Sequence, residues 1–125
     1  MKTITVHQPY AHLIIVGDKP IETRSRKTNI RGRIAIHASK KKSKLSRCFE
    51  TENISYGAIL GTVEIVDCVP VEEIRDNLTI FQLSAGDYSD GRYAWIMKNP
   101  IKFKEPVCIR GKQGWWNWKG GEEYE

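Results

Sequence analysis

The stretch from Ile30 to Lys41 reads Ile-Arg-Gly-Arg-Ile-Ala-Ile-His-Ala-Ser-Lys-Lys. Its start predicts a turn over residues 29–32, because glycine tolerates a positive φ. Residues 33–38 alternate in polarity, which is typical of a strand that buries one face. The strand is followed by a lysine run that begins at Lys40. Together with residues 7–10, this stretch predicts one cationic, hydrogen-bonding cleft on a small β-rich barrel.

Short β-rich segments surround this stretch. The patterns predict further strands at 2–6, 20–24, 56–69, 93–97 and 101–110. They favour short helices after Pro9, within 40–49 and within 70–76. Gly61, inside the longest strand, indicates a bend or bulge at a barrel corner. We therefore predict an α+β fold, a small mixed β-barrel of about six strands with two or three short flanking helices.

The length of 125 residues allows one domain with its own core. We expect this domain to cover residues 1–125, with the glycine-rich, acidic residues 119–125 as a frayed tail. The sequence has no apolar run near the roughly 20 residues that cross a bilayer, and its start does not resemble a signal peptide. We expect a cytoplasmic monomer that contacts no membrane and needs no cofactor.

The three cysteines are widely spaced, at Cys48, Cys68 and Cys108. They form no Cys-x-x-Cys pair, so the sequence does not predict a zinc site, and we expect no bound metal. Cys68 and Cys108 lie in apolar runs, where a cysteine usually packs as a small core residue. Buried free thiols of this kind would fit a reducing compartment.

The charge of the chain is distributed unevenly. Residues 1–47 carry twelve Lys or Arg against two acidic residues, whereas the remainder carries eight against thirteen. A basic first third and an acidic remainder favour a polyanionic partner at one end, most commonly nucleic acid. The alternative is a basic face that is merely solvated.

Several polar side chains near this basic end are candidate nucleic-acid contacts. The lysines and arginines suit phosphates, while His7, Gln8, Tyr10 and Glu22 could read or clamp a nucleotide. In the alternative, His7 and Gln8 form a local cap, Tyr10 packs in the core, and Glu22 makes a surface ion pair. The complete set is His7, Gln8, Pro9, Tyr10, Lys19, Glu22, Arg24, Arg31, Gly32, Arg33, Ser39, Lys40 and Lys41.

Three of the four tryptophans lie within residues 115–118. Exposed indoles stack unpaired bases, whereas Trp95, in its apolar strand, is expected in the core. An exposed tryptophan end also leaves open a protein-interaction adaptor. Motifs for serine or metal-dependent hydrolysis, for a P-loop and for a dinucleotide fold are absent from the sequence. A desolvated Lys19 beside Glu22 or Glu64 could nevertheless act as a base.

Taken together, these motifs resemble the ASCH domain (activating-signal-cointegrator homology), a branch of the PUA-like superfamily. The resemblance covers nearly the whole chain, and its pieces follow the expected order. They are Thr5–Ala11, Gly17–Arg24, Arg31–Arg33, Ile36–Ala38, Gly57–Asp67, Tyr93–Trp95 and Gly111–Gly114.

The resemblance implies a β-barrel with a cleft for RNA or another single-stranded nucleic acid. In the cointegrator-like members the corresponding His7, Gln8, Pro9, Arg24, Arg31 and Gly32 look cleft-facing. Some small bacterial members are amidohydrolases that act on acylated cytidine through a lysine, a threonine and a glutamate. Lys19 matches their lysine, but Glu22 takes the place of the threonine, and Thr23 is adjacent. A ribonuclease activity is a further implication of the family, for which this sequence has no diagnostic residues.

Overall fold

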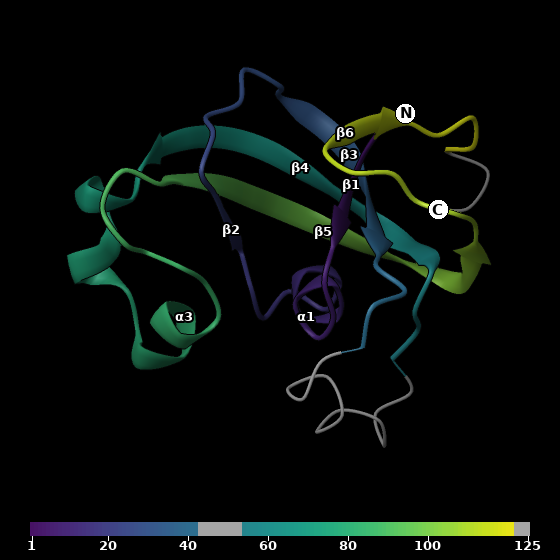
Figure 1. Ribbon diagram of the computed structural model, residues 1–125, viewed down its shortest axis with the longest axis horizontal. Coiled ribbons are helices and arrows are strands. Elements are labelled where there is room, and N and C mark those ends of the chain that lie inside the picture. Colours follow the sequence, from purple (N-terminus) through teal and green to yellow (C-terminus); the bar gives the residue numbers. More distant parts are fainter. Residues whose placement is uncertain (43–53, 122–125) are drawn as a thin grey trace.

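The computed structural model describes residues 1–42 and 54–121, in which six strands form one sheet that curls into a half-barrel (Figure 1). The strand order is β2-β5-β4-β3-β1-β6. β1 runs parallel to β3, and the other pairs are antiparallel. The predicted α+β barrel of about six strands is therefore confirmed. The strands are β1 (Lys2–Val6), β2 (Ile21–Arg24), β3 (Gly32–Ala38), β4 (Ala58–Pro70), β5 (Tyr93–Cys108) and β6 (Trp115–Asn117).

The two longest strands, β4 and β5, pair along most of their length and bend together at three register shifts. At the bend, a Cβ atom on Gly61 would lie 2.1 Å from the carbonyl oxygen of Ile101, so only glycine fits there. The predicted division into separate strands at 93–97 and 101–110 is wrong. Lys98 and Ile101 both pair with β4 across the irregular stretch, which keeps β5 continuous.

Helix α1 (Tyr10–Ile15) follows β1, as Pro9 predicted, and packs against β3, β4 and β5. It buries Ala11, Ile14 and Ile15 in the main core and ends before Gly17, whose φ is +93°. None of the helices in the described residues is long and apolar enough to span a bilayer.

The connection between β4 and β5 contains three short helical turns. The predicted helix at 70–76 is replaced by two 3-10 helices, η2 (Val71–Glu73) and η3 (Arg75–Asn77). They are followed by α3 (Ile80–Ser84), which begins at a capping box of Thr79 and Gln82. The helix expected within 40–49 falls mainly on residues outside the described ranges, and residues 40–42 are not helical.

The edges of the curled sheet meet along a line that we call the seam, between β2 on one side and β1 and β6 on the other. Side chains bridge it. The rings of Trp95 and Trp115 stack with centroids 5.4 Å apart and planes 8° apart. The Arg24 guanidinium crosses from β2 and donates to the carbonyl oxygen of Thr5 at 3.0 Å. A hydrogen bond and a ring contact thus hold the half-barrel closed.

The two chain ends of the described region lie side by side (Figure 1). The amino group of Met1 donates to the carbonyl oxygen of Trp118 at 2.6 Å, and Gly121 is buried. The remainder of the predicted tail, 122–125, lies outside the described residues.

The cysteine predictions fare unevenly. Cys68 is half-buried against the core, but Cys108 is exposed, so its expected core position is wrong. It is the last residue of β5, and strand alternation turns its side chain outward. Cys48 lies outside the described residues.

Candidate nucleic-acid interface

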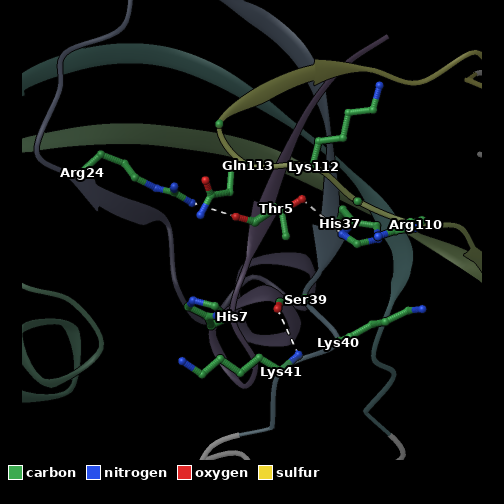
Figure 2. Close-up of a pocket in the computed structure, with 12 residues that line it drawn as sticks. Thr5, His7, Arg24, His37, Ser39, Lys40, Lys41, Arg110, Lys112 and Gln113 are labelled. Atoms are coloured by element: carbon green, nitrogen blue, oxygen red, sulfur yellow. Dashed lines mark hydrogen bonds between the residues drawn. The ribbon is translucent and has the colours of Figure 1, made fainter.

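A groove of about 570 Å³, here called the basic groove, opens over the ends of β1 and β3 (Figure 2). Five lysines and arginines line it, and no carboxylate is among its lining residues. Figure 2 shows residues 39–41 on one side of Thr5 and the 110–113 segment on the other. The lining residues are Thr5, His7, Arg24, His37, Ser39, Lys40, Lys41, Arg110, Gly111, Lys112, Gln113 and Gly114.

Strand direction explains why residues so far apart in sequence meet here. Because β1 and β3 are parallel, their C-terminal ends lie at the same edge of the sheet. The backbone N–H of Ser39 donates to the carbonyl oxygen of Val6 at 3.0 Å, which holds the two exits together. The end of β5 is fixed beside them, since the Ile109 N–H donates to the carbonyl oxygen of Gly57.

A buried hydrogen-bond network forms the floor of the basic groove. The His37 ring, 2% exposed, approaches the carbonyl oxygen of Ile109 through Nε2 at 2.7 Å and the Thr5 hydroxyl through Nδ1 at 3.2 Å. A carbonyl only accepts, so Nε2 carries the proton and Nδ1 accepts from Thr5. The Thr5 hydroxyl oxygen in turn accepts from the Trp116 indole at 3.1 Å. Every member of the network has a partner.

Gly111 rests directly on this floor. A Cβ atom there would lie 2.5 Å from Cε1 of His37 and 2.9 Å from the Thr5 hydroxyl oxygen. Its lack of a side chain therefore lets the 110–114 segment approach the sheet and bring its cations over the groove.

Burial lowers the pKa of His37, and nearby Lys40 lowers it further, against the opposing hydrogen bond to Ile109. The unfolded chain therefore binds the proton more readily than the folded one below about pH 6.5. As the pH falls from about 6.5 towards the lowered pKa of His37, we expect the free energy of unfolding to decrease by up to about 1.4 kcal/mol per pH unit. Urea unfolding between about pH 5.5 and 7.5 measures it.

The matched control is His7→Gln, which removes an exposed histidine at the same groove and should retain this pH dependence. His37→Gln should lose it. An unchanged slope in His37→Gln would show that other groups set the dependence.

A second cavity of about 470 Å³, the side pocket, adjoins the basic groove and shares Thr5, His7 and Arg24 with it. Glu22 lies on its wall, 8% exposed. Its Oε2 accepts from Nε of Arg24 at 3.0 Å and lies 2.9 Å from Nη2 of the same guanidinium. Arg24 also lies over the Trp95 ring, 5.7 Å from its centroid. One carboxylate oxygen contacted by two guanidinium nitrogens, a backbone carbonyl and an aromatic face thus fix the orientation of this guanidinium.

Five of the candidate contacts converge on the basic groove: His7, Arg24, Ser39, Lys40 and Lys41. Tyr10 and Glu22 line the side pocket instead. Gln8 and Pro9 are buried, and the Gln8 amide donates to the carbonyl oxygen of Ser55 and accepts from the His12 N–H. The local cap considered from the sequence therefore describes Gln8.

Lys19 is buried, 4% exposed, next to Glu22 of the side pocket. Its ammonium donates to the carbonyl oxygen of Ile21 and lies 3.5 Å from the Glu22 carboxylate. Burial lowers its pKa, and Glu22 opposes that shift. The larger of the two small cavities that Lys19 lines has a volume of about 30 Å³.

The structure does not bring the arginine-glycine turn to the groove. Arg31 donates to the carbonyl oxygens of Thr28 and Ile30, and Gly32, with φ +94°, is exposed. Arg33 pairs with Glu64 at 3.0 Å. Six residues along a strand span about 20 Å, so the two ends of the 33–39 segment lie far apart.

Sequence reasoning did not assign Thr5, His37, Arg110, Lys112 or Gln113 to the site. Arg110, Lys112 and Gln113 approach it through the pairing of β5 with β4 and of β6 with β1, and no local sequence pattern reports these pairings. A signal was present in the glycines at 111 and 114, which flank two polar residues ahead of the tryptophans.

Comparison with known proteins identifies related chains. The model of the ASCH domain matches residues 4–107. Activating signal cointegrator 1 of Homo sapiens is 29% identical over 128 residues, which cover 90% of this chain and 21% of the human protein. The Mus musculus protein of the same name is 27% identical, with the same coverage. The chain spans about a fifth of the length of these curated relatives.

Solved structures agree with this assignment at the level of the fold. The crystal structure of ASCH from Zymomonas mobilis superposes with a TM-score of 0.59 at 16% identity, covering 86% of this chain and 73% of that one. A mutant of the same bacterial protein gives 0.58 at 17% identity, covering 86% and 75%. The match of the ASCH model to most of the chain shows that this protein belongs to the ASCH domain family.

Proposed function

We propose that this protein binds single-stranded nucleic acid, RNA foremost, with the sugar-phosphate backbone in the basic groove. The observation that supports it is a groove lined by five lysines and arginines and by no carboxylate. Arg24, Lys40, Lys41, Arg110 and Lys112 provide the positive charge.

The chemistry of these side chains suits phosphate contacts. Lys40, Lys41 and Lys112 are exposed, and an ammonium on a flexible stem contacts a phosphate oxygen without reading a base. Arg24 differs because its guanidinium is fixed in place, so it suits one defined phosphate at the junction of the two cavities. Neutralising these phosphates would release counterions and make the affinity depend on salt.

A salt series with a short fluorescent RNA tests the proposal. For single strands the log–log slope is roughly 0.7 per phosphate contact, so removing two contacts should reduce it by about 1.4. We expect that reduction in Lys40→Ala/Lys41→Ala and again in Arg110→Ala/Lys112→Ala, with weaker binding in both. Fluorescence anisotropy at several salt concentrations measures slope and affinity.

Lys102→Ala/Lys104→Ala is the matched control, because it removes the same charge from exposed positions on β5 that line neither cavity. It should keep the wild-type slope. Equal losses in the control and the groove variants would contradict a groove-specific site, and no binding at low salt would refute the proposal.

Hydrolysis of an acylated cytidine-type nucleoside is the second candidate, and the lowered pKa of buried Lys19 is the observation that favours it. A deprotonated lysine can act as a base or nucleophile. Its side chain lines only small cavities, and Glu64 pairs with Arg33, so the geometry supports binding better. After incubation with the protein, we expect acetylated cytidine to release no acetate and labelled RNA to remain intact. Deacetylation that is abolished by Lys19→Met would instead favour the hydrolase.

A further inference from the structure

A third cavity of about 570 Å³, here called the aromatic groove, lies along the seam. We propose that it holds one unstacked base against Trp115, while the backbone of the same strand continues into the basic groove. This inference rests on the proposed function and adds a base-binding subsite to it. The aromatic groove is lined by Ile4, Arg24, Ser25, Arg26, Lys27, Thr28, Asn29, Ile30, Trp95, Gly114 and Trp115.

The two tryptophans form a fixed platform in this groove. Trp95 is buried, 4% exposed, and its indole donates to the carbonyl oxygen of Arg26 at 3.1 Å. Trp115 stacks on it with nearly parallel planes and is only partly buried. Trp115 is thus held by a ring that cannot easily move, while part of its own surface faces the groove. A rigid indole needs little ordering when a base stacks on it.

The aromatic groove adjoins the basic groove. Arg24 and Gly114 line both cavities. A Cβ atom on Gly114 would meet nothing within 4 Å, so the chain is open on the side where that atom would lie. A strand can therefore pass from one cavity to the other beside the fixed guanidinium of Arg24.

The charges around the platform suit the same ligand. Arg26 and Lys27 are exposed on the 25–30 segment opposite Trp115 and can contact phosphates that flank the stacked base. A base in a duplex is already stacked on its neighbours and has no free face. The platform therefore selects single strands, and it tolerates different bases because each has a π-face.

Affinity measurements with two Trp115 variants test the subsite. Trp115→Leu keeps an apolar side chain at this position but removes the ring, and we expect it to weaken binding of a short oligouridine by about tenfold or more. Trp115→Phe should recover much of the affinity. The salt slope should stay at its wild-type value in both, because no phosphate contact is lost.

An abasic nucleotide, placed at each position of the oligouridine in turn, provides the second measurement. One position should weaken binding to wild type and have little effect on Trp115→Leu, since the base and the ring act as a pair. Wild type that binds every abasic probe as tightly as the intact one would overturn the inference, even if Trp115→Leu did not fold.

The result also distinguishes the inference from the proposed function. If Trp115→Leu binds like wild type while Lys40→Ala/Lys41→Ala binds weakly, the stacking subsite is wrong and the basic groove stands. If wild type binds no oligonucleotide at low salt, both are wrong. A duplex of the same sequence that binds more tightly than the single strand would also overturn the subsite.

Discussion

Replacing Arg24 with methionine is expected to reduce both the stability of the fold and the affinity for nucleic acid. The change removes the guanidinium beside Glu22, whose side chain is 11% exposed, together with the bond to Thr5 across the seam and the cation over Trp95. A buried pair that loses one partner costs about 3–5 kcal/mol. Here Lys19 remains 3.5 Å from Glu22, and the Arg24 side chain is 30% exposed, so we expect about 2 kcal/mol.

Urea unfolding and RNA anisotropy on the same protein separate the two effects. We expect affinity to fall by at least about tenfold, since Arg24 lines all three cavities and its charge-assisted bonds are the stronger kind. Glu22→Gln/Arg24→Met should be more stable than Arg24→Met, because no buried carboxylate is left without its guanidinium. Arg24→Lys should keep part of the affinity but not the contact of two nitrogens with the Glu22 carboxylate oxygen. Wild-type stability in Arg24→Met would show that the seam does not depend on this side chain.

Among the glycines described above, Gly61 is the one whose replacement by alanine should lower the free energy of unfolding most. The new Cβ would overlap the Ile101 carbonyl oxygen and lie 3.1 Å from Cα of Lys102, both backbone atoms of a paired strand. Neither can move without breaking the β4–β5 ladder. Overpacking costs about 1–3 kcal/mol where side chains can adjust, so we expect at least about 3 kcal/mol against rigid backbone.

Gly91→Ala is the comparison that isolates steric overlap from backbone strain. Gly91 has φ +85° and open space around its Cβ position, so its replacement costs only the unfavourable backbone conformation, roughly 1 kcal/mol. Urea midpoints should therefore fall much further for Gly61→Ala. Similar losses in the two variants would contradict the close approach of β4 and β5.

Local sequence patterns predicted those parts of the fold that local physics determines. The strand over 33–38 and the helix after Pro9 follow from side-chain alternation and from glycine and proline positions, and both are confirmed. The division of β5 was wrong because Asn99 and Pro100 have the composition of a turn. In the folded chain, pairing with β4 continues on both sides of them, and Asn99 takes φ +53°.

For the candidate site too, local patterns identified residues but did not predict the pairing of distant strands. His7, Lys40 and Lys41 were recognisable from their residue types just after two predicted strands, and the parallel pairing of β1 and β3 brings them together. Arg33 was assigned to the cleft because it is close in sequence to Ser39. The two residues lie at opposite ends of β3 and are therefore far apart in space. Arg110 and Lys112 could not be placed, since their position depends on where the end of β5 meets β1 across 105 or more residues of sequence.

The way in which the seam is closed affects how substitutions can alter the cavities beside it. In the described part of the chain, the contacts that span it are made by side chains such as Arg24 and the tryptophan pair rather than by a peptide ladder. Individual substitutions can therefore widen, narrow or recharge the mouth of the half-barrel while the six-stranded scaffold keeps its register. Ligand preference could thereby diversify without a change in strand order or register.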